Sequence, residues 1–230
     1  MPYQIDATTY RKDQHLPVGV GWSMRPSGIR PTTIIIHTTS SLTQNTTFDN
    51  EARFLYNSRD VSAHFLNGKQ SQIVQFLSPD LQAWHAGAAL TAYTNMHSIG
   101  IENHVSVGEQ WTAAEHESLT WLVKRLMAQY AIGLTQIETH RAVALPEGRK
   151  RDPAGWDDQS FYAWRASLGV RLYTVVAGRY GAIPQQDRIP TAPAAGYFAP
   201  NAVITCDDLT NGYHHVAKGI GFIPAGQVQA

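Results

Sequence analysis

The sequence TTIIIH at residues 32–37 is the stretch that decides the fold. Its β-branched apolar residues leave no polar face, so they predict a strand buried on both sides, as strands of largely parallel sheets are. A hydroxyl-rich loop follows, and then apolar residues recur at helical spacing over 48–57. A buried strand that leads into a helix is typical of an α/β fold.

Further strands are predicted downstream of this helix. Two short apolar runs, 61–66 and 72–77, flank a polar loop with an Asn-Gly dipeptide and predict a β-hairpin with a tight turn. Residues 98–102 predict another strand, in which Glu102 points away from the face that carries the isoleucines.

Helices and one more strand complete the alternation. A long amphipathic helix is expected from Thr112, which forms a capping box with Glu115, and Gly133 is expected to end it. The remaining expected elements are a strand at 136–140, a loop at 142–155 and a helix that begins at Asp157. Strands and helices interleave, which predicts an α/β domain with a mixed central sheet flanked by helices.

The character of the chain changes near residue 170. Gly, Pro and Ala become dense, helical periodicity disappears, and short β-type runs at 173–176, 202–206, 213–216 and 219–223 take over. We therefore predict a first domain over 1–170, with its core at about 30–168, and a small all-β barrel over 171–230.

Composition excludes several classes of function. Lys plus Arg and Asp plus Glu each number 18 in 230 residues, so the formal net charge is zero and does not attract the chain to nucleic acid. Nucleic acid is therefore not expected as a partner. Cys206 is the single cysteine, which excludes an intrachain disulfide and a Cys-based zinc cluster. The first thirty residues carry no signal-peptide pattern, and no apolar stretch is long enough to span a bilayer. We expect a monomer that is made in a cytoplasm and does not insert into membranes.

Three possible metal ligands stand at the ends of predicted elements. His37 follows the isoleucine run, His140 ends the 136–140 strand, and Asp152 lies in the loop beyond. Two imidazoles and a carboxylate leave the fourth position of a tetrahedral zinc ion open for water. Their spacing fits no short metal-binding motif, and the chain has ten histidines, so the residues alone leave a structural role for each of them open.

Four motifs resemble one known family. VSAHF at 61–65, AWHAG at 83–87, SIGIE at 98–102 and GRKRDP at 148–153 occur in the order found in N-acetylmuramoyl-L-alanine amidases, a family of peptidoglycan recognition proteins, phage lysins and recycling amidases. The resemblance covers about residues 30–168. It implies a zinc-dependent enzyme that cleaves the amide bond between N-acetylmuramic acid and L-alanine in bacterial peptidoglycan.

The resemblance also implies roles for single residues. It makes His37, His140 and Asp152 the zinc ligands, and Glu102 the base that activates water and passes a proton to the leaving amine. Lys150 lies two residues before Asp152, so in an extended segment its ammonium projects to the same side and could stabilise the oxyanion. The plain alternative for Glu102 is a carboxylate on the surface, and the plain alternative for Lys150 is a solvated charge in a loop.

Other motif positions carry weaker implications. The resemblance places Trp84 and His85 in the substrate groove, although Trp84 could equally belong to the core. His64 is expected to be a hydrogen-bonded core or supporting group without a catalytic role. Ala63 stands where some relatives have a catalytic tyrosine, which leaves the role of base to Glu102. The remaining histidines considered, His97, His104 and His116, are expected on the surface or on a helix face.

Residues 171–230 resemble a bacterial SH3-type wall-binding domain. The likeness is clearest in NGYHHV at 211–216 and GIGFIP at 219–224. The plain alternative is a small barrel that binds nothing. His214 and His215 are adjacent on an expected strand and point to opposite faces, so they are not expected to chelate one ion together.

Three functions remain open at this point. A phage or prophage endolysin, which acts at the cell wall, is favoured by the implied ligand set together with the wall-binding-like tail, residues 171–230. A cytosolic recycling amidase that acts on soluble anhydro-muropeptides fits the Glu102, Lys150 and Asp152 pattern but not the tail. A non-catalytic peptidoglycan receptor is disfavoured because such receptors typically lose the third ligand, and Asp152 is present.

Overall fold

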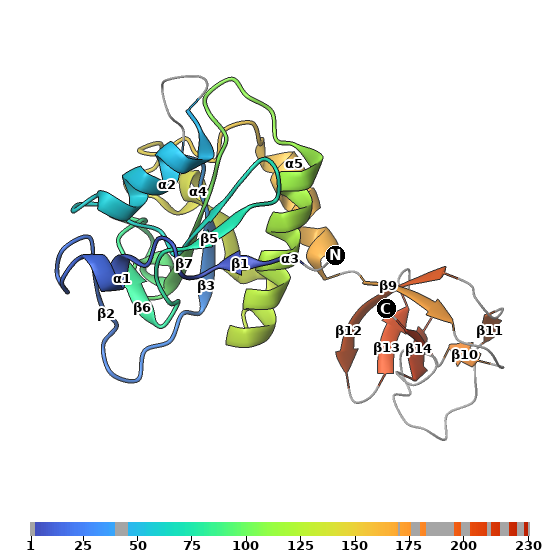
Figure 1. The fold of residues 1–230 in the computed structure, drawn as a ribbon. Helices are drawn as coiled ribbons and strands as arrows, with labels where there is room; N and C mark the ends of the chain where they lie inside the picture. The colour runs from blue at the N-terminus through green and yellow to red at the C-terminus, as the bar shows by residue number, and fades with distance from the viewer. Residues whose placement is uncertain are drawn as a thin grey trace. The chain divides into compact units, whose positions relative to one another are not determined.

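The computed structural model describes residues 3–39 and 46–169 in full, and from residue 171 onward the backbone of strands within 171–229. The chain forms two compact units, Met1–Asp158 and Gln159–Ala230, which are described separately (Figure 1). Our division of the chain at residue 170 stays a prediction.

A mixed six-stranded sheet organises the described part of the first unit. All neighbouring strands run parallel except the β4–β5 pair, which is antiparallel. In spatial order the strands are β1 (Ile5–Asp6), β5 (Ile73–Gln75), β4 (Phe65–Asn67), β7 (Ser98–Asn103), β3 (Thr33–Ile36) and β8 (Ile137–Thr139). The predicted α/β class with a mixed central sheet is confirmed.

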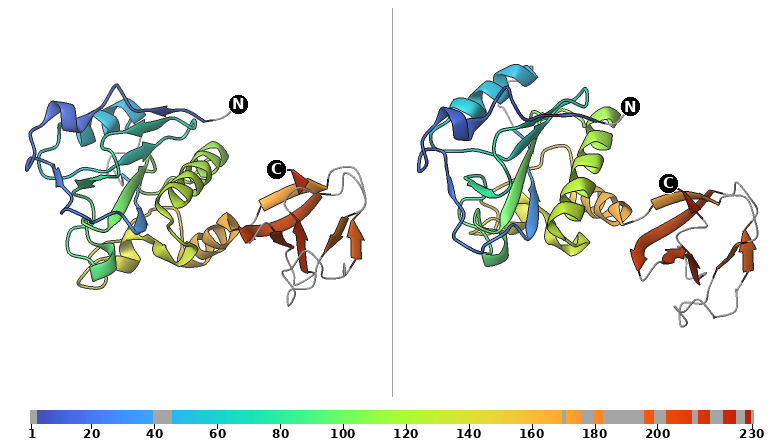
Figure 2. Two further views of the ribbon diagram at one scale, coloured as in Figure 1. Left: turned by 90° about the horizontal axis from the view of Figure 1, so that it is seen from below. Right: turned by 60° about the horizontal axis from the view of Figure 1, so that its bottom comes forward.

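Helices cover both faces of this sheet. Leu66 of β4 packs into an apolar cluster with Ala52 and Leu55 of α2 (Phe48–Asn57). Its neighbour Asn67 points the other way and donates from Nδ2 to the carbonyl oxygen of Glu115, 2.9 Å away, in α3 (Ala113–Tyr130). The helices α2 and α3 therefore lie on opposite faces of the sheet (Figure 2).

The strand β3, which lies between β7 and β8, brings distant segments together at the carboxyl ends of the strands. Its four residues are buried, and Ile36 pairs with Ile101 of β7 and with Thr139 of β8, all in parallel register. The carboxyl ends of these three strands thus meet, and His37 follows β3 directly. Parallel α/β sheets commonly bind ligands at the carboxyl ends of their strands.

The segment before β3 contains structure that we did not predict. It forms β1, the short helix α1 (Lys12–His15) and β2 (Trp22–Met24), which pairs with β6 (Leu81–Ala83). Both strands are very short and pair only with residues some sixty positions away, so the local sequence has no periodic signal that could reveal them. The residues before the core that we predicted at about 30–168 are therefore part of the fold.

The predicted hairpin is confirmed, but its turn differs. β4 and β5 are joined by residues 68–72, and Ser71, rather than Gly68, has a left-handed backbone with a φ of 64°. Gly68 is needed for space, because a Cβ atom there would lie 2.6 Å from the Phe48 ring. The Asn-Gly dipeptide thus allows a helix to pack against the loop and does not form a two-residue turn.

Two further boundaries differ from the expected ones. Thr112 caps α3 through Glu115 N as predicted, but the helix ends at Tyr130, where Ala131 adopts the left-handed conformation with a φ of 55°, and not at Gly133. The strand expected at 136–140 ends earlier. His140 begins the short helix α4 (His140–Val143), so it belongs to the first turn of a helix.

The second unit contains α5 (Asp158–Leu168) from Gln159 onward, followed by antiparallel strands. All four predicted β-type runs contain strands. A five-stranded sheet has the order β14 (Gly221–Pro224), β13 (Tyr213–Val216), β12 (Val203–Thr210), β9 (Arg171–Val175) and β15 (Val228–Gln229), and β10 (Tyr180–Ala182) pairs with β11 (Gly196–Phe198). The side chains of Cys206, His214 and His215 lie outside the described residues, and the SH3-like barrel stays a prediction. Within the described chain, every helix is too short or too polar to cross a bilayer.

Candidate metal centre

Three side chains converge at the carboxyl ends of β3 and β8. The Nδ1 atom of His37 lies 3.0 Å from Nδ1 of His140 and 3.1 Å from Oδ2 of Asp152, and His140 Nδ1 lies 3.0 Å from the same oxygen. Both histidines are buried. His37 thus meets two residues that follow it by more than a hundred positions, and the three side chains present their ligand atoms to one point.

The chemistry of this donor set fits a metal ion. Ligand atoms around a tetrahedral zinc ion are separated by roughly 3.3 Å, close to the separations found here. A carboxylate oxygen only accepts, so two protonated ring nitrogens bonded to it would face each other at hydrogen-bond distance. A shared cation removes that conflict, and we conclude that His37, His140 and Asp152 could hold a metal.

The tautomer of His140 suits metal binding. Its Nε2 atom lies 3.1 Å from the carbonyl oxygen of Ala86, which can only accept, so Nε2 carries the proton. In the neutral ring, Nδ1 then has a free lone pair directed at the other two ligands. The AWHAG motif thus contributes a backbone group to the site.

Burial and charge keep the ligands in the forms that metal ions require. Burial lowers the pKa of His37 to about 4, against the opposing effect of Asp152, so the ring is neutral at physiological pH. Burial alone would raise the pKa of Asp152, but hydrogen bonds with His140 and His37 outweigh it and hold that pKa well below the usual range. A neutral His37 imidazole and an ionised Asp152 carboxylate result.

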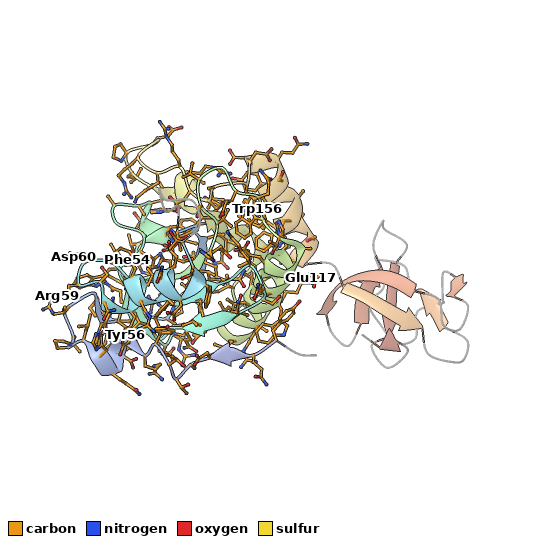
Figure 3. The ribbon with its side chains drawn as sticks, turned by 45° about the horizontal axis from the view of Figure 1, so that its top comes forward. Phe54, Tyr56, Arg59, Asp60, Glu117 and Trp156 are labelled. Atoms are coloured by element: carbon orange, nitrogen blue, oxygen red, sulfur yellow. The ribbon has the colours of Figure 1, made fainter. Side chains whose placement is uncertain are left out.

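A cavity of about 220 Å³ opens onto these ligands. Four other residues singled out in the sequence, Trp84, His85, Glu102 and Lys150, line it. The cavity is also lined by residues to which the sequence assigned no role at the site, namely Thr38, Thr39, Glu51, Phe54, Leu55, Val61 and Ser62. Glu51, Phe54 and Leu55 come from one face of α2, and Phe54 is 60% exposed (Figure 3). Helical spacing could group these three, but the sequence has no signal for what that face meets.

Glu102 enters the cavity from β7. As predicted from strand alternation, it shares a face with Gly100, away from the isoleucines, and its Oε2 atom is buried without a hydrogen-bond partner among the described residues. Burial raises the pKa of Glu102 well above its usual value, the negative charges of Asp152 and Glu51 add to this, and Lys150 opposes it. A carboxyl group in a cavity whose pKa is raised by burial is a candidate for proton transfer.

Trp84 and His85 contact more than the cavity. Trp84 donates from Nε1 to Ser23 Oγ at 3.2 Å and is half-buried. His85 Nδ1 lies 3.0 Å from His37 Nε2, so this ring stands directly behind one of the three candidate ligands. Both residues also border a second hollow of about 430 Å³, whose further lining includes Gln82, Asn95, Arg149 and Lys150.

The other histidines have separate roles in the fold. His64 is fully buried and accepts at Nδ1 from the backbone N–H of Gly100 at 3.0 Å, so it is a hydrogen-bonded core residue. His104 is also buried, with Nε2 2.6 Å from the carbonyl oxygen of Thr46, and our expectation of a surface or helix-face position was wrong. It directly follows β7, where the strand end is covered by the segment before α2. His116 packs on a face of α3 against Trp156.

Comparison with known proteins links this site to one family. A family model described as N-acetylmuramoyl-L-alanine amidase matches residues 27–155. N-acetylmuramoyl-L-alanine amidase XlyA of Bacillus subtilis (strain 168) is 28% identical over 162 residues, which are 70% of this chain and 53% of that protein. The 1,6-anhydro-N-acetylmuramyl-L-alanine amidase AmpD of Enterobacter cloacae is 33% identical over 107 residues, which are 45% of this chain and 56% of that protein.

Solved structures agree on the fold. The catalytic domain of XlyA superposes with a TM-score of 0.55 at 23% identity, covering 72% of this chain and 99% of that domain. The chain spans about half the length of the curated relatives that it matches.

Proposed function

The chain belongs to the N-acetylmuramoyl-L-alanine amidase family, and from that premise we propose that it hydrolyses the amide bond between N-acetylmuramic acid and L-alanine in bacterial peptidoglycan. The observation that carries the proposal is the convergence of His37, His140 and Asp152 in a cavity that Glu102 and Lys150 also line. Two imidazoles and a carboxylate that can hold a metal, with a second carboxylate and an ammonium group beside them, suit metal-assisted amide hydrolysis.

We propose zinc as the ion that His37, His140 and Asp152 hold. When bound, zinc polarises a scissile carbonyl and makes a water molecule more acidic. Glu102 takes the proton of the attacking water and passes it to the leaving amine, which suits a carboxyl group whose pKa is raised by burial. The ammonium group of Lys150 offsets the negative charge that develops on the carbonyl oxygen.

The substrate is proposed to lie across both hollows. The scissile amide joins a sugar to a peptide, so the two parts of the substrate must extend in different directions from the reacting carbonyl. The two hollows share Val61, Trp84, His85 and Lys150 in their walls. Trp84 offers an aromatic surface to a sugar ring or peptide between them, and His85 forms part of the wall beside it.

A wall-degrading role is proposed for the whole chain. We propose that residues 171–230 form an SH3-like module that binds the wall, and that the protein is an endolysin of phage or prophage origin acting at the bacterial cell wall. The likeness to AmpD supports the alternative role, recycling of soluble anhydro-muropeptides. Rates on intact sacculi and on soluble anhydro-muropeptides separate the two roles, and a clear preference for sacculi is expected.

The chemical proposal is tested with purified peptidoglycan. We expect loss of turbidity, and mass mapping of the products should show peptides with a free N-terminal L-alanine. Chelation should abolish the activity and zinc should restore it. New reducing ends on the sugars without free L-alanine would contradict the proposed bond. Binding without cleavage at saturating zinc would indicate a receptor instead.

A further inference from the structure

A chain of hydrogen bonds behind the candidate metal centre ends on His37. Ser98 Oγ donates to the carbonyl oxygen of Thr94 at 2.8 Å. His85 Nε2 lies 3.2 Å from Ser98 Oγ, and His85 Nδ1 lies 3.0 Å from His37 Nε2. These hydrogen bonds thus connect the carbonyl oxygen of Thr94 to Nε2 of His37. The other ring nitrogen of His37, Nδ1, faces the candidate metal position.

The direction of each hydrogen bond follows from the first. The Thr94 carbonyl oxygen can only accept, so it takes the single proton of the Ser98 hydroxyl group. Ser98 Oγ must then accept from His85 Nε2, which therefore carries a proton. In a neutral His85 ring, Nδ1 is left as an acceptor, and His37 Nε2 donates to it. His37 Nδ1, in its own neutral ring, then has no proton and can bind a cation.

We propose that Ser98 and His85 are positioning residues that fix His37 in the tautomer whose Nδ1 atom binds the metal. The proposal rests on the metal-dependent function proposed above. It gives His85 a role besides lining the substrate groove, and it explains why a serine begins the SIGIE motif. Groups that orient metal-bound histidines in this way typically change metal affinity 10- to 100-fold when they are removed.

The surroundings hold the His85 ring in the required place. Asn95 Oδ1 accepts from the backbone N–H groups of both His85, at 3.0 Å, and Ala86, at 2.7 Å. On the other side, a Cβ atom on Gly100 would lie 2.5 Å from the His85 ring, so only glycine leaves room for it. Because the His37 side chain is only 2% exposed, the His85 ring and not bulk water accepts its Nε2 proton.

We call the hydrogen-bonded series Thr94–Ser98–His85–His37 the relay. Four variants test the relay through zinc affinity. His85→Phe keeps a ring but removes both nitrogens, and we expect zinc affinity to fall 10- to 100-fold. Ser98→Ala removes only the acceptor for His85 Nε2, and a loss of about 10-fold is expected. His85→Asn keeps an acceptor near the Nδ1 position and should recover most of the affinity. His97→Ala is the matched control, because it removes a histidine–hydroxyl contact to Thr94 just outside the chain of bonds.

Affinity is measured by competition with a chromophoric chelator, without substrate, on full-length chains whose folding is checked by circular dichroism. Nitrogen-15 NMR of the histidine rings reports the tautomers directly. We expect protons on Nε2 of both His37 and His85 in the unsubstituted zinc-bound protein, and mixed tautomers at His85 in Ser98→Ala. This spectrum decides the question even where His85→Phe does not fold.

Two results would overturn the relay: a zinc affinity within twofold of the unsubstituted chain in both Ser98→Ala and His85→Phe, or a proton on Nδ1 of His85. Its failure is distinct from failure of the amidase proposal. A protein whose zinc affinity depends on Ser98 and His85 but that cleaves no peptidoglycan would refute only the amidase function. An active amidase whose zinc affinity ignores Ser98 and His85 would refute only the relay.

Discussion

His140 and Arg149 donate to the same acceptor, the carbonyl oxygen of Ala86, from Nε2 at 3.1 Å and from a terminal guanidinium nitrogen at 2.9 Å. Arg149 also donates to the carbonyl oxygens of Ala88 and Leu145, each at 2.7 Å. The GRKRDP motif therefore contributes Asp152 to the candidate metal centre directly and supports His140 through the backbone of the AWHAG motif.

Replacing Arg149 by lysine should weaken both the fold and the metal site. A single ammonium group cannot reach three carbonyl oxygens in the way a planar guanidinium does. We expect a loss of about 1–2 kcal/mol in the free energy of unfolding and a several-fold loss of zinc affinity. Thermal unfolding and chelator competition measure the two effects, with Arg151→Lys as the neighbouring control. Unchanged zinc affinity in Arg149→Lys would show that the shared carbonyl does not support His140.

Replacing Glu102 by glutamine should separate turnover from metal binding. Glutamine keeps the shape of the side chain but cannot take a proton from water. We expect kcat to fall at least about 100-fold, while the zinc content stays near that of the unsubstituted chain, because Glu102 is not one of the three ligands. Product release followed by mass spectrometry, with metal analysis of the same sample, measures both. Full activity in this variant would remove Glu102 from the mechanism.

Replacing Glu51 by glutamine should shift the pH dependence of the reaction. Glu102 must be ionised to act as a base, and since its pKa is raised, kcat/KM should fall as the pH is lowered through that pKa. The negative charge of Glu51 contributes to the raised value, so its removal lowers the pKa of Glu102. The acid limb of the kcat/KM profile should therefore move to lower pH in Glu51→Gln. Asp60→Asn, at the neighbouring hollow, is the control. An acid limb that stays at the same pH in Glu51→Gln would contradict the role of Glu102 as the base that this limb reports.

The sequence predicted the parts of the site that lie on strongly patterned elements. The apolar run before His37 and the alternation around Glu102 specify both strand and direction, because a buried strand allows few other readings. The positions of the residues behind His37, namely His85 and Ser98, were not predictable in this way. The contact between His85 and His37 depends on where a loop returns beside the sheet, and Ser98 looks like any strand residue until its partners are known.

Lys12 shows the same limit in the fold. It is fully buried, and its Nζ atom donates to the carbonyl oxygens of Leu55, Ser58 and Val61 at the end of α2 and in the segment that leads to the cavity wall. Lysine is almost never fully buried unless its charge is compensated, so composition and pattern place it on the surface. Only the three acceptors, more than forty residues away, account for its position.

Replacing Lys12 by methionine should destabilise the first unit. Burial lowers the pKa of Lys12 to about 8, so the side chain is still mostly charged at pH 7. Methionine fills the space but leaves three carbonyl oxygens without their donor, which should cost about 2–4 kcal/mol of the free energy of unfolding. Denaturant unfolding measures the loss, and Gln14→Met, on the exposed side of the same helix, should stay within about 0.5 kcal/mol. An unchanged midpoint in Lys12→Met would mean that water replaces the ammonium group.

Glu115 should make the stability of the fold depend on pH. It is fully buried in the first turn of α3, and burial raises its pKa from 4.5 to about 7. Because the folded state holds this proton more tightly than the unfolded state, the stability is fully present below pH 4.5 and falls as the pH rises to about 7. Glu115→Gln stays neutral and should escape that loss, so it should exceed the unsubstituted chain at pH 8 by on the order of 2–3 kcal/mol and match it at pH 4. Denaturant unfolding at the two pH values measures the difference, with Glu117→Gln, exposed on the same helix (Figure 3), as the control. The same pH dependence in Glu115→Gln and in the unsubstituted chain would mean that Glu115 is ionised in the folded protein at neutral pH.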